Sequence, residues 1–103
     1  MITRLWRARA ASTEAAEAYQ RYFSGEAVLH LNRIPGFQGA RLLARDSDGL
    51  IEILVMTLWD SMDAVRAFAG ERADVAVVEP AVRAILSEFD DQVSHYNTML
   101  AIS

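Results

Sequence analysis

The sequence predicts an α+β fold, a ferredoxin-like arrangement of strand, helix, two strands, helix and strand on an antiparallel sheet. Three observations predict it. Two strand–helix–strand units follow one another along the chain, and a tight turn over 47–49 joins two strands into a hairpin. The length of 103 residues is typical of one domain, so residues 1–103 are expected to form a single core.

The first unit comprises a strand over residues 1–10 and a long helix. Apolar and mixed positions alternate along the strand, which is the pattern of a half-buried strand. Ser12 has the hydroxyl of a helix N-cap, and Gly25 is expected to bend the helix without ending it. The segment Ile34-Pro35-Gly36 ends it, because proline disfavours a helical residue before it. The apolar helix positions recur every three or four residues: Ala15, Tyr19, Tyr22, Phe23, Ala27 and Leu31.

The second unit starts with a hairpin of strands over 37–46 and 50–59. Asp60-Ser61 caps a second helix, and Gly70 closes it. Pro80 starts a short third helix that runs to about residue 86, since proline is tolerated in the first helical turn. A last strand is predicted over 89–100.

The strand over 50–59 is apolar on both faces. Ile51, Ile53, Val55 and Trp59 alternate with Leu50, Leu54, Met56 and Leu58. The chain's own helices can cover only one face of an antiparallel sheet, so a second copy is the economical cover for the other. A homodimer is therefore expected, and the alternative is a monomer that keeps an apolar patch exposed.

Composition narrows the classes of partner. The net charge is −4 and the ten basic residues are scattered, which argues against nucleic acid. The chain has no cysteine, which excludes disulfides and thiolate metal sites and suits a cytoplasmic location. No apolar run approaches the length of a membrane span and no signal-peptide pattern opens the chain, so no membrane association is expected.

Several segments occur in an order that resembles the antibiotic biosynthesis monooxygenase family, the dimeric α+β barrels. The most specific are Ile34-Pro35-Gly36-Phe37 before a strand and Trp59-Asp60-Ser61 before the helix that carries Phe68. The resemblance covers nearly the whole chain. It implies two sheets packed face to face and a pocket in each subunit between sheet and helices. The family includes cofactor-free monooxygenases that form quinones, haem-degrading enzymes, isomerases and members of unknown role, so the fold does not fix the chemistry.

Trp59 is the first candidate for a ligand contact, because the matching tryptophan of the haem-degrading members lines the pocket. The alternative is that its indole fills the core beside Phe68, with the N–H bonded to a carbonyl. Haem degradation is less favoured. Those members also use an asparagine on the first strand and a histidine on the helix after the tryptophan, whereas this chain has Trp6 and Arg7 on the strand and no histidine in 61–78.

His95 and His30 are the two residues whose ordinary pKa is near neutrality. His95 is the better candidate for a base, because alternation places it on a mostly apolar face with Phe89 and Val93. Each has a structural alternative: a hydrogen-bonded residue of that face for His95, and a solvated helix pair with Glu26 for His30.

The leading hypothesis is a monooxygenase-like enzyme that uses no cofactor or metal and oxidises a small phenolic, quinol or polyketide-type aromatic substrate. His95 and Trp59 are the candidate catalytic residues. The expected aromatic walls of the substrate site are Tyr19, Phe23, Phe68 and Trp6. The alternative is a non-catalytic dimeric protein that binds a small aromatic ligand in the same pocket.

Overall fold

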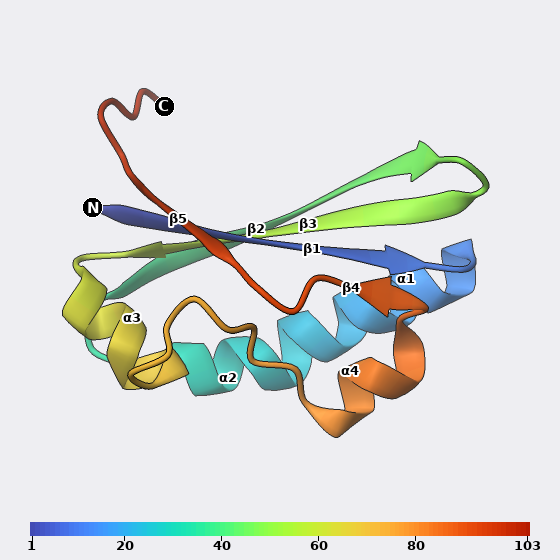
Figure 1. Ribbon diagram of the computed structural model, residues 1–103, viewed down its shortest axis with the longest axis horizontal. Helices are drawn as coiled ribbons and strands as arrows, with labels where there is room; N and C mark the ends of the chain where they lie inside the picture. Colours follow the sequence, from blue (N-terminus) through green and yellow to red (C-terminus); the bar gives the residue numbers. More distant parts are fainter.

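An antiparallel sheet carries all the helices on one face, and the computed structural model describes residues 1–103 (Figure 1). The strand order is β2-β3-β1-β4, and β5 also pairs with β1. The predicted ferredoxin-like α+β fold is thus confirmed. The strands are β1 (Ile2–Ala10), β2 (Phe37–Ser47), β3 (Leu50–Trp59), β4 (Glu88–Phe89) and β5 (Ser94–Asn97).

The predicted hairpin joins β2 and β3 through a turn at Asp48 and Gly49. Both residues have positive φ, 51° and 80°, a conformation that glycine and aspartate adopt more readily than most residues. β3 also pairs with β1 along its whole length, from Ile2 opposite Trp59 to Ala10 opposite Ile51. β1 and β3 therefore form the centre of the sheet, where a site can be built on rigid strands.

The long helical segment runs through α1 (Thr13–Tyr22), the π-helical turn η1 (Phe23–Ala27) and α2 (Val28–Leu31). Ser12 caps α1, its Oγ accepting a hydrogen bond from the backbone N–H of Ala15 at 3.1 Å. The helix continues through Gly25 as predicted, and the distortion there is a widened turn. Such π-helical turns are frequent at functional sites, and this one presents Phe23 to the interior.

The segment between α2 and β2 fits closely against α3 (Met62–Ala69). Gly36 has φ of +94°, and a Cβ built on it would lie 2.6 Å from the Cβ of Ala64. The Gly36 carbonyl accepts a hydrogen bond from the Asp60 N–H at 2.8 Å. Ser61 caps α3 and Gly70 closes it, both as predicted. Gly36 thus fixes where α3 begins, and so where its Phe68 lies.

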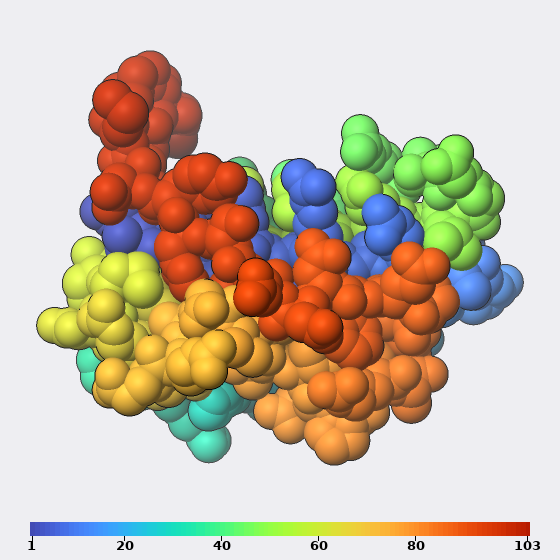
Figure 2. Space-filling view, in the orientation of Figure 1, coloured from blue at the N-terminus to red at the C-terminus, as the bar shows by residue number.

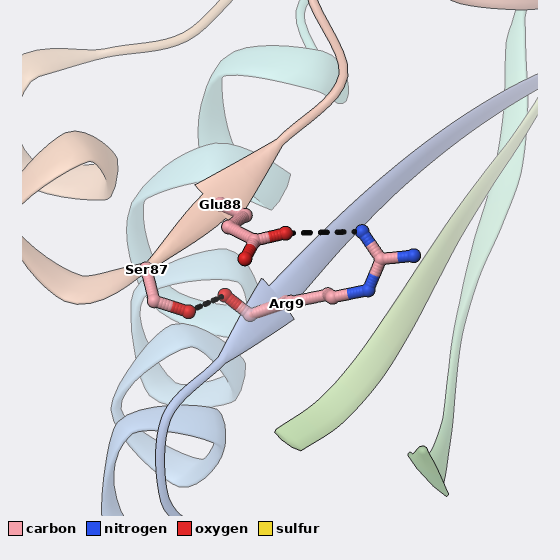
Figure 3. A network of polar contacts seen from close by, with 3 residues as sticks. All are labelled: Arg9, Ser87 and Glu88. Carbon is pink, nitrogen blue, oxygen red and sulfur yellow. Dashed lines mark hydrogen bonds and ion pairs between the residues drawn. The ribbon is translucent and has the colours of Figure 1, made fainter. Parts of the chain in front are cut away.

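The short helix α4 (Pro80–Ile85) leads into β4, which is tied to the end of β1. Ser87 Oγ donates to the Arg9 carbonyl at 3.0 Å, and the Arg9 guanidinium lies 3.3 Å from the Glu88 carboxylate (Figure 3). Both Arg9 and Glu88 are substantially exposed, so this ion pair contributes little to stability.

The prediction of one continuous last strand over 89–100 was wrong. The chain leaves β1 after Asp90, whose N–H still donates to the Arg7 carbonyl, and residues 91–93 pair instead with the loop at 74–76. There the Ala76 N–H donates to the Asp91 carbonyl at 2.8 Å, and the Val93 N–H donates to the Asp74 carbonyl at 2.9 Å. β5 then returns to β1 over Ser94–Asn97, and no strand continues beyond it.

The helices cover only one of the two faces of the sheet (Figure 1). Figure 1 shows the helices on one side and the C-terminal segment rising on the other. On β3, Ile53, Val55 and Trp59 are buried beneath the helices, while Leu54, Met56 and Leu58 remain half-buried on the bare face. This is the division of faces that the alternation predicts. No helix is long and apolar enough to cross a membrane.

Candidate functional site

A cavity of about 310 Å³ lies between the helix-covered face of β1 and β3 and the helices above it. This volume is at the lower end of the range of small-molecule sites. The walls come from both central strands, the long helix, α3 and the loop that precedes α4. The lining residues are Arg4, Trp6, Tyr19, Tyr22, Phe23, Glu26, Ala27, His30, Leu31, Val55, Thr57, Phe68, Val77, Glu79, Val82 and Val93.

The four aromatic residues expected as substrate walls, Trp6, Tyr19, Phe23 and Phe68, all line this cavity. Trp6 is held by a hydrogen bond from its indole N–H to the Asp90 carbonyl at 2.7 Å. The Tyr19 ring lies 6.4 Å from the Trp6 ring and 6.1 Å from the Phe23 ring, centroid to centroid. Trp6, Tyr19 and Phe23 are therefore a connected group of rings, suited to a flat apolar ligand, while the Phe68 ring contacts His30 and Trp59 instead.

Trp59 lies behind that wall. Its side chain is fully buried and does not line the cavity. Its indole stacks on Phe68 at a centroid distance of 5.5 Å and packs edge-on to Phe37 at 5.3 Å. The indole N–H donates to the Thr57 hydroxyl at 2.9 Å, where the packing alternative expected a backbone carbonyl. Trp59 thus supports two cavity residues, Phe68 and Thr57, without facing the cavity in this structure.

His95 does not line the cavity either, and Arg4 lies between its imidazole and the cavity. It lies opposite Arg4 in the β1–β5 pairing, and its Nε2 is 2.9 Å from Arg4 Nη1. Burial, together with the positive charge of Arg4, lowers the pKa of His95, and the nearby Asp74 opposes that shift. The imidazole is therefore neutral at neutral pH and can accept a proton. Its surroundings are more polar than the alternation suggested, because Arg4 shares its face.

Arg4 was not singled out from the sequence, although it points to the same side of β1 as Ile2 and Trp6. It is only 5% exposed and lines the cavity. Burial lowers its pKa to about 10, so it keeps its charge at neutral pH. An arginine among the buried positions of an alternating strand is the signal that could have found it.

His30 and Tyr22 lie at the mouth of the cavity. His30 is exposed and lines the cavity directly, its ring 6.0 Å from that of Phe68. No hydrogen bond joins it to Glu26, the partner expected for a solvated pair. Burial, with the charges of Glu79 and Glu26, raises the pKa of the Tyr22 phenol, and burial raises that of Tyr19. Both phenols are therefore protonated at neutral pH.

A second, wider hollow of about 960 Å³ runs along α1 and the β2–β3 hairpin. It shares only Tyr19 and Phe23 with the first cavity. Its charged residues, such as Arg45, are exposed, and it has no buried charged side chain to orient a ligand. The smaller cavity, with its buried cation, is the better candidate site. No group of three or more potential metal ligands gathers anywhere in the structure.

Comparison with known proteins identifies relatives by structure alone. No family model matches the sequence, and no curated protein matches it. A Streptomyces coelicolor monooxygenase from the gene ActVA-Orf6, solved with nanaomycin D, superposes with a TM-score of 0.72 at 15% identity, over 99% of this chain and 90% of that one. The haem-degrading protein MhuD of Mycobacterium tuberculosis, solved with two haems in its active site, gives 0.65 at 21% identity over 100% of both chains.

A Bacillus cereus protein described as a candidate antibiotic biosynthesis monooxygenase also matches, with a TM-score of 0.65 at 15% identity, over 99% of this chain and 96% of that one. The TM-scores establish a shared fold. The low sequence identities leave the chemistry open. The chain therefore has the ferredoxin-like fold of structures named as antibiotic biosynthesis monooxygenases and of a haem-degrading protein, as the sequence resemblance implied.

Proposed function

We propose that the protein is a cofactor-independent monooxygenase that oxidises a small phenolic, quinol or polyketide-type aromatic compound in the 310 Å³ cavity. The observation that carries the proposal is the ring-lined cavity with a neutral imidazole directly behind its one buried cation. The fold shared with monooxygenases supports the reaction class. The aromatic walls support the class of substrate.

The chemistry needs only dioxygen and a base. Removal of a proton from an anthrone or quinol gives an electron-rich carbanion or phenolate, which transfers an electron to dioxygen and combines with the reduced oxygen. For an anthrone, the resulting hydroperoxide loses water, so that one oxygen atom enters the quinone and the other leaves as water. A base positioned at the substrate and unprotonated at the operating pH serves the first step, and His95 is the proposed base.

His95 can take that proton only if its Nε2 gives up the hydrogen bond from Arg4. A shift of the Arg4 guanidinium toward a bound oxyanion would break this hydrogen bond and release Nε2, so that the event that brings in the substrate also frees the base. His30 is the competing candidate, because it lines the cavity directly. The two histidines lie on separate elements, α2 and β5, and can be removed separately.

Oxygen uptake with a panel of anthrones and hydroquinones tests the proposal, with parent protein, His95→Ala and His30→Ala measured side by side. We expect turnover in the parent, a loss of about 10² to 10⁴-fold in kcat for His95→Ala, and near-parent activity for His30→Ala. Full activity in His95→Ala removes His95 from the mechanism. Loss of activity in His30→Ala alone would identify His30 as the base.

The second candidate function is a non-catalytic protein that binds an aromatic ligand. It is favoured by the placement of His95 behind the wall, with its Nε2 already engaged. Native mass spectrometry of the purified protein, looking for a retained aromatic molecule, distinguishes the two functions when read with the oxygen-uptake panel. A retained ligand that is released unchanged in air supports binding alone.

Haem is the cofactor that one group of structural relatives suggests. The residues here fit it poorly. Its iron would need a protein donor, and α3 carries no histidine, while the one histidine of the cavity, His30, lies at the exposed mouth. Titration of the protein with haem, followed by the Soret band, should therefore give no shift characteristic of axial ligation.

We also propose a homodimer formed through the bare face of the sheet. Met56 lies opposite Leu5 and Leu54 lies opposite Leu43, and together with Leu58 they form an apolar strip that Arg7 and Arg41 flank. The C-terminal segment stands out from the body on the same side (Figures 1 and 2), with Met99 97% and Ile102 84% exposed. A second copy related by a twofold axis would cover the strip on both subunits.

A further inference from the structure

Arg4 is the one charged side chain buried in the core of the molecule. It projects from the middle of β1 to the helix-covered face, between Ile2 and Trp6. A buried charge is costly unless a counter-charge and hydrogen bonds compensate it. The hydrogen-bond partners of Arg4 therefore show whether a counter-charge within the protein compensates its guanidinium.

The partners of Arg4 are neutral. Nη1 donates to the Ala73 carbonyl at 2.6 Å and lies 2.9 Å from His95 Nε2. Nη2 donates to the Val75 carbonyl at 3.3 Å. The centre of the guanidinium lies 5.6 Å from the centroid of the Phe68 ring, which completes the surroundings. No carboxylate pairs with Arg4, although four other arginines form ion pairs: Arg9, Arg45, Arg66 and Arg72.

The guanidinium keeps donors for a ligand. It has five N–H groups; the contacts above engage both of those on Nη1 and one on Nη2, so the Nε–H and one Nη2 N–H make no bond within the protein. No fully buried side-chain nitrogen in the structure lacks a partner. The unbonded Nε is therefore accessible, and the hollow that Arg4 lines is the 310 Å³ cavity.

The charges around the cavity set where an anion can sit. The acidic residues of its lining, Glu26 and Glu79, are exposed at the mouth, where water screens them. Asp74 is also exposed, in the loop whose Ala73 and Val75 carbonyls bind Arg4, and it makes no ion pair with Arg4. The inner end beside Arg4 is thus positive and enclosed, and a negative oxygen there would meet a cation in a medium of low polarity.

We propose that Arg4 is the anion-binding residue of the cavity, and that its ligand is a flat aromatic compound with a carboxylate or phenolate oxygen. The oxyanion pairs with the guanidinium, and the rings lie against Trp6 and Phe68. A carboxylate can take two parallel N–H bonds from an arginine, which adds directional selectivity to the charge. This inference rests on the proposed function only in taking the same cavity as the ligand site.

The test compares 2-naphthoate with its neutral analogue 2-naphthamide, by isothermal titration calorimetry at neutral pH. The two probes share their rings and differ in charge. We expect the parent to bind the naphthoate about tenfold more tightly or better, the gain of a charged hydrogen bond. Arg4→Gln should lose the preference while still binding the amide. Arg21→Gln, at an exposed arginine of α1, should keep it.

Arg4→Lys provides the second variant, because it keeps the charge should Arg4→Gln fail to fold. It should retain a preference for naphthoate that is weaker than the parent's, since an ammonium cannot present a pair of parallel N–H groups. Equal affinity of the parent for the two probes, or binding of neither, overturns the proposal, as does an undiminished preference in Arg4→Gln. None of these measurements depends on oxygen, so failure of turnover and failure of anion binding are separate results.

Discussion

Gly36→Ala offers the sharpest test of how the site is positioned. Gly36 has φ of +94°, where a residue with a Cβ is strained by roughly 1–2 kcal/mol. The added Cβ would also lie 2.6 Å from the Cβ of Ala64, a rigid and buried atom that no rotamer change can remove. Overpacking of this kind costs about 1–3 kcal/mol. The free energy of unfolding should therefore fall by about 2–5 kcal/mol.

For a domain of this size, each kcal/mol lowers Tm by about 4–8 °C, so the expected fall is roughly 8–40 °C. The assay is thermal unfolding followed by circular dichroism, at equal protein concentration. Gly25→Ala is the matched control, because a Cβ there meets nothing within 4 Å and φ is not positive. It should leave Tm unchanged or raise it slightly.

A compensating variant separates the two causes. Ala64→Gly removes the atom that clashes, so the double variant Gly36→Ala/Ala64→Gly should recover the steric part of the loss and keep the strain of the backbone. Equal Tm values for Gly36→Ala and Gly25→Ala would refute the account of how α3 is fixed against the start of β2.

Three further predictions concern the site and the assembly. Thr57→Val removes the acceptor of the buried Trp59 N–H and should lower the free energy of unfolding by about 1–3 kcal/mol in urea denaturation. In a Trp59→Phe background the same substitution should cost clearly less. An equal cost in the two backgrounds would contradict the hydrogen bond. Because the pKa of His95 is lowered in the folded state, its neutral form contributes stability above about pH 6.5 that is lost as pH falls through the folded-state pKa. Parent protein should therefore lose more stability on acidification than His95→Gln, and parallel pH profiles would exclude this linkage. Met56→Arg places a charge in the middle of the bare face and should halve the mass measured by light scattering. The control Glu71→Arg, on an exposed loop, should leave that mass unchanged. A monomeric parent protein would rule out the dimer.

Local patterns were enough to predict most elements of the fold. The caps at Ser12 and Ser61 depend on residues three positions apart, and the β2–β3 hairpin depends on a short turn. The broken last strand could not be predicted in this way. Residues 91–93 leave β1 because backbone groups at 74–76 pair with them, and no local pattern reports such a partner.

The site was predicted in part. The aromatic walls follow from helix spacing and strand alternation, which report the buried face. Trp59 and His95 lie on the expected face, yet side-chain packing places each behind a residue that lines the cavity, Phe68 and Arg4 respectively. Arg4 was missed because an arginine on a short N-terminal strand is usually solvated. Its burial results from the loop carbonyls of Ala73 and Val75, about 70 residues away.

The ring-lined cavity is proposed to support insertion of oxygen into an aromatic substrate without a cofactor. The decisive measurement is turnover of an anthrone by haem-free, chelator-treated protein under isotopically heavy dioxygen, followed by mass spectrometry of the quinone. We expect a quinone that carries one heavy oxygen atom, formed much faster with the parent protein than with His95→Ala. A quinone formed at the same rate without protein, or one that takes its new oxygen from water, would exclude oxygen insertion by this protein.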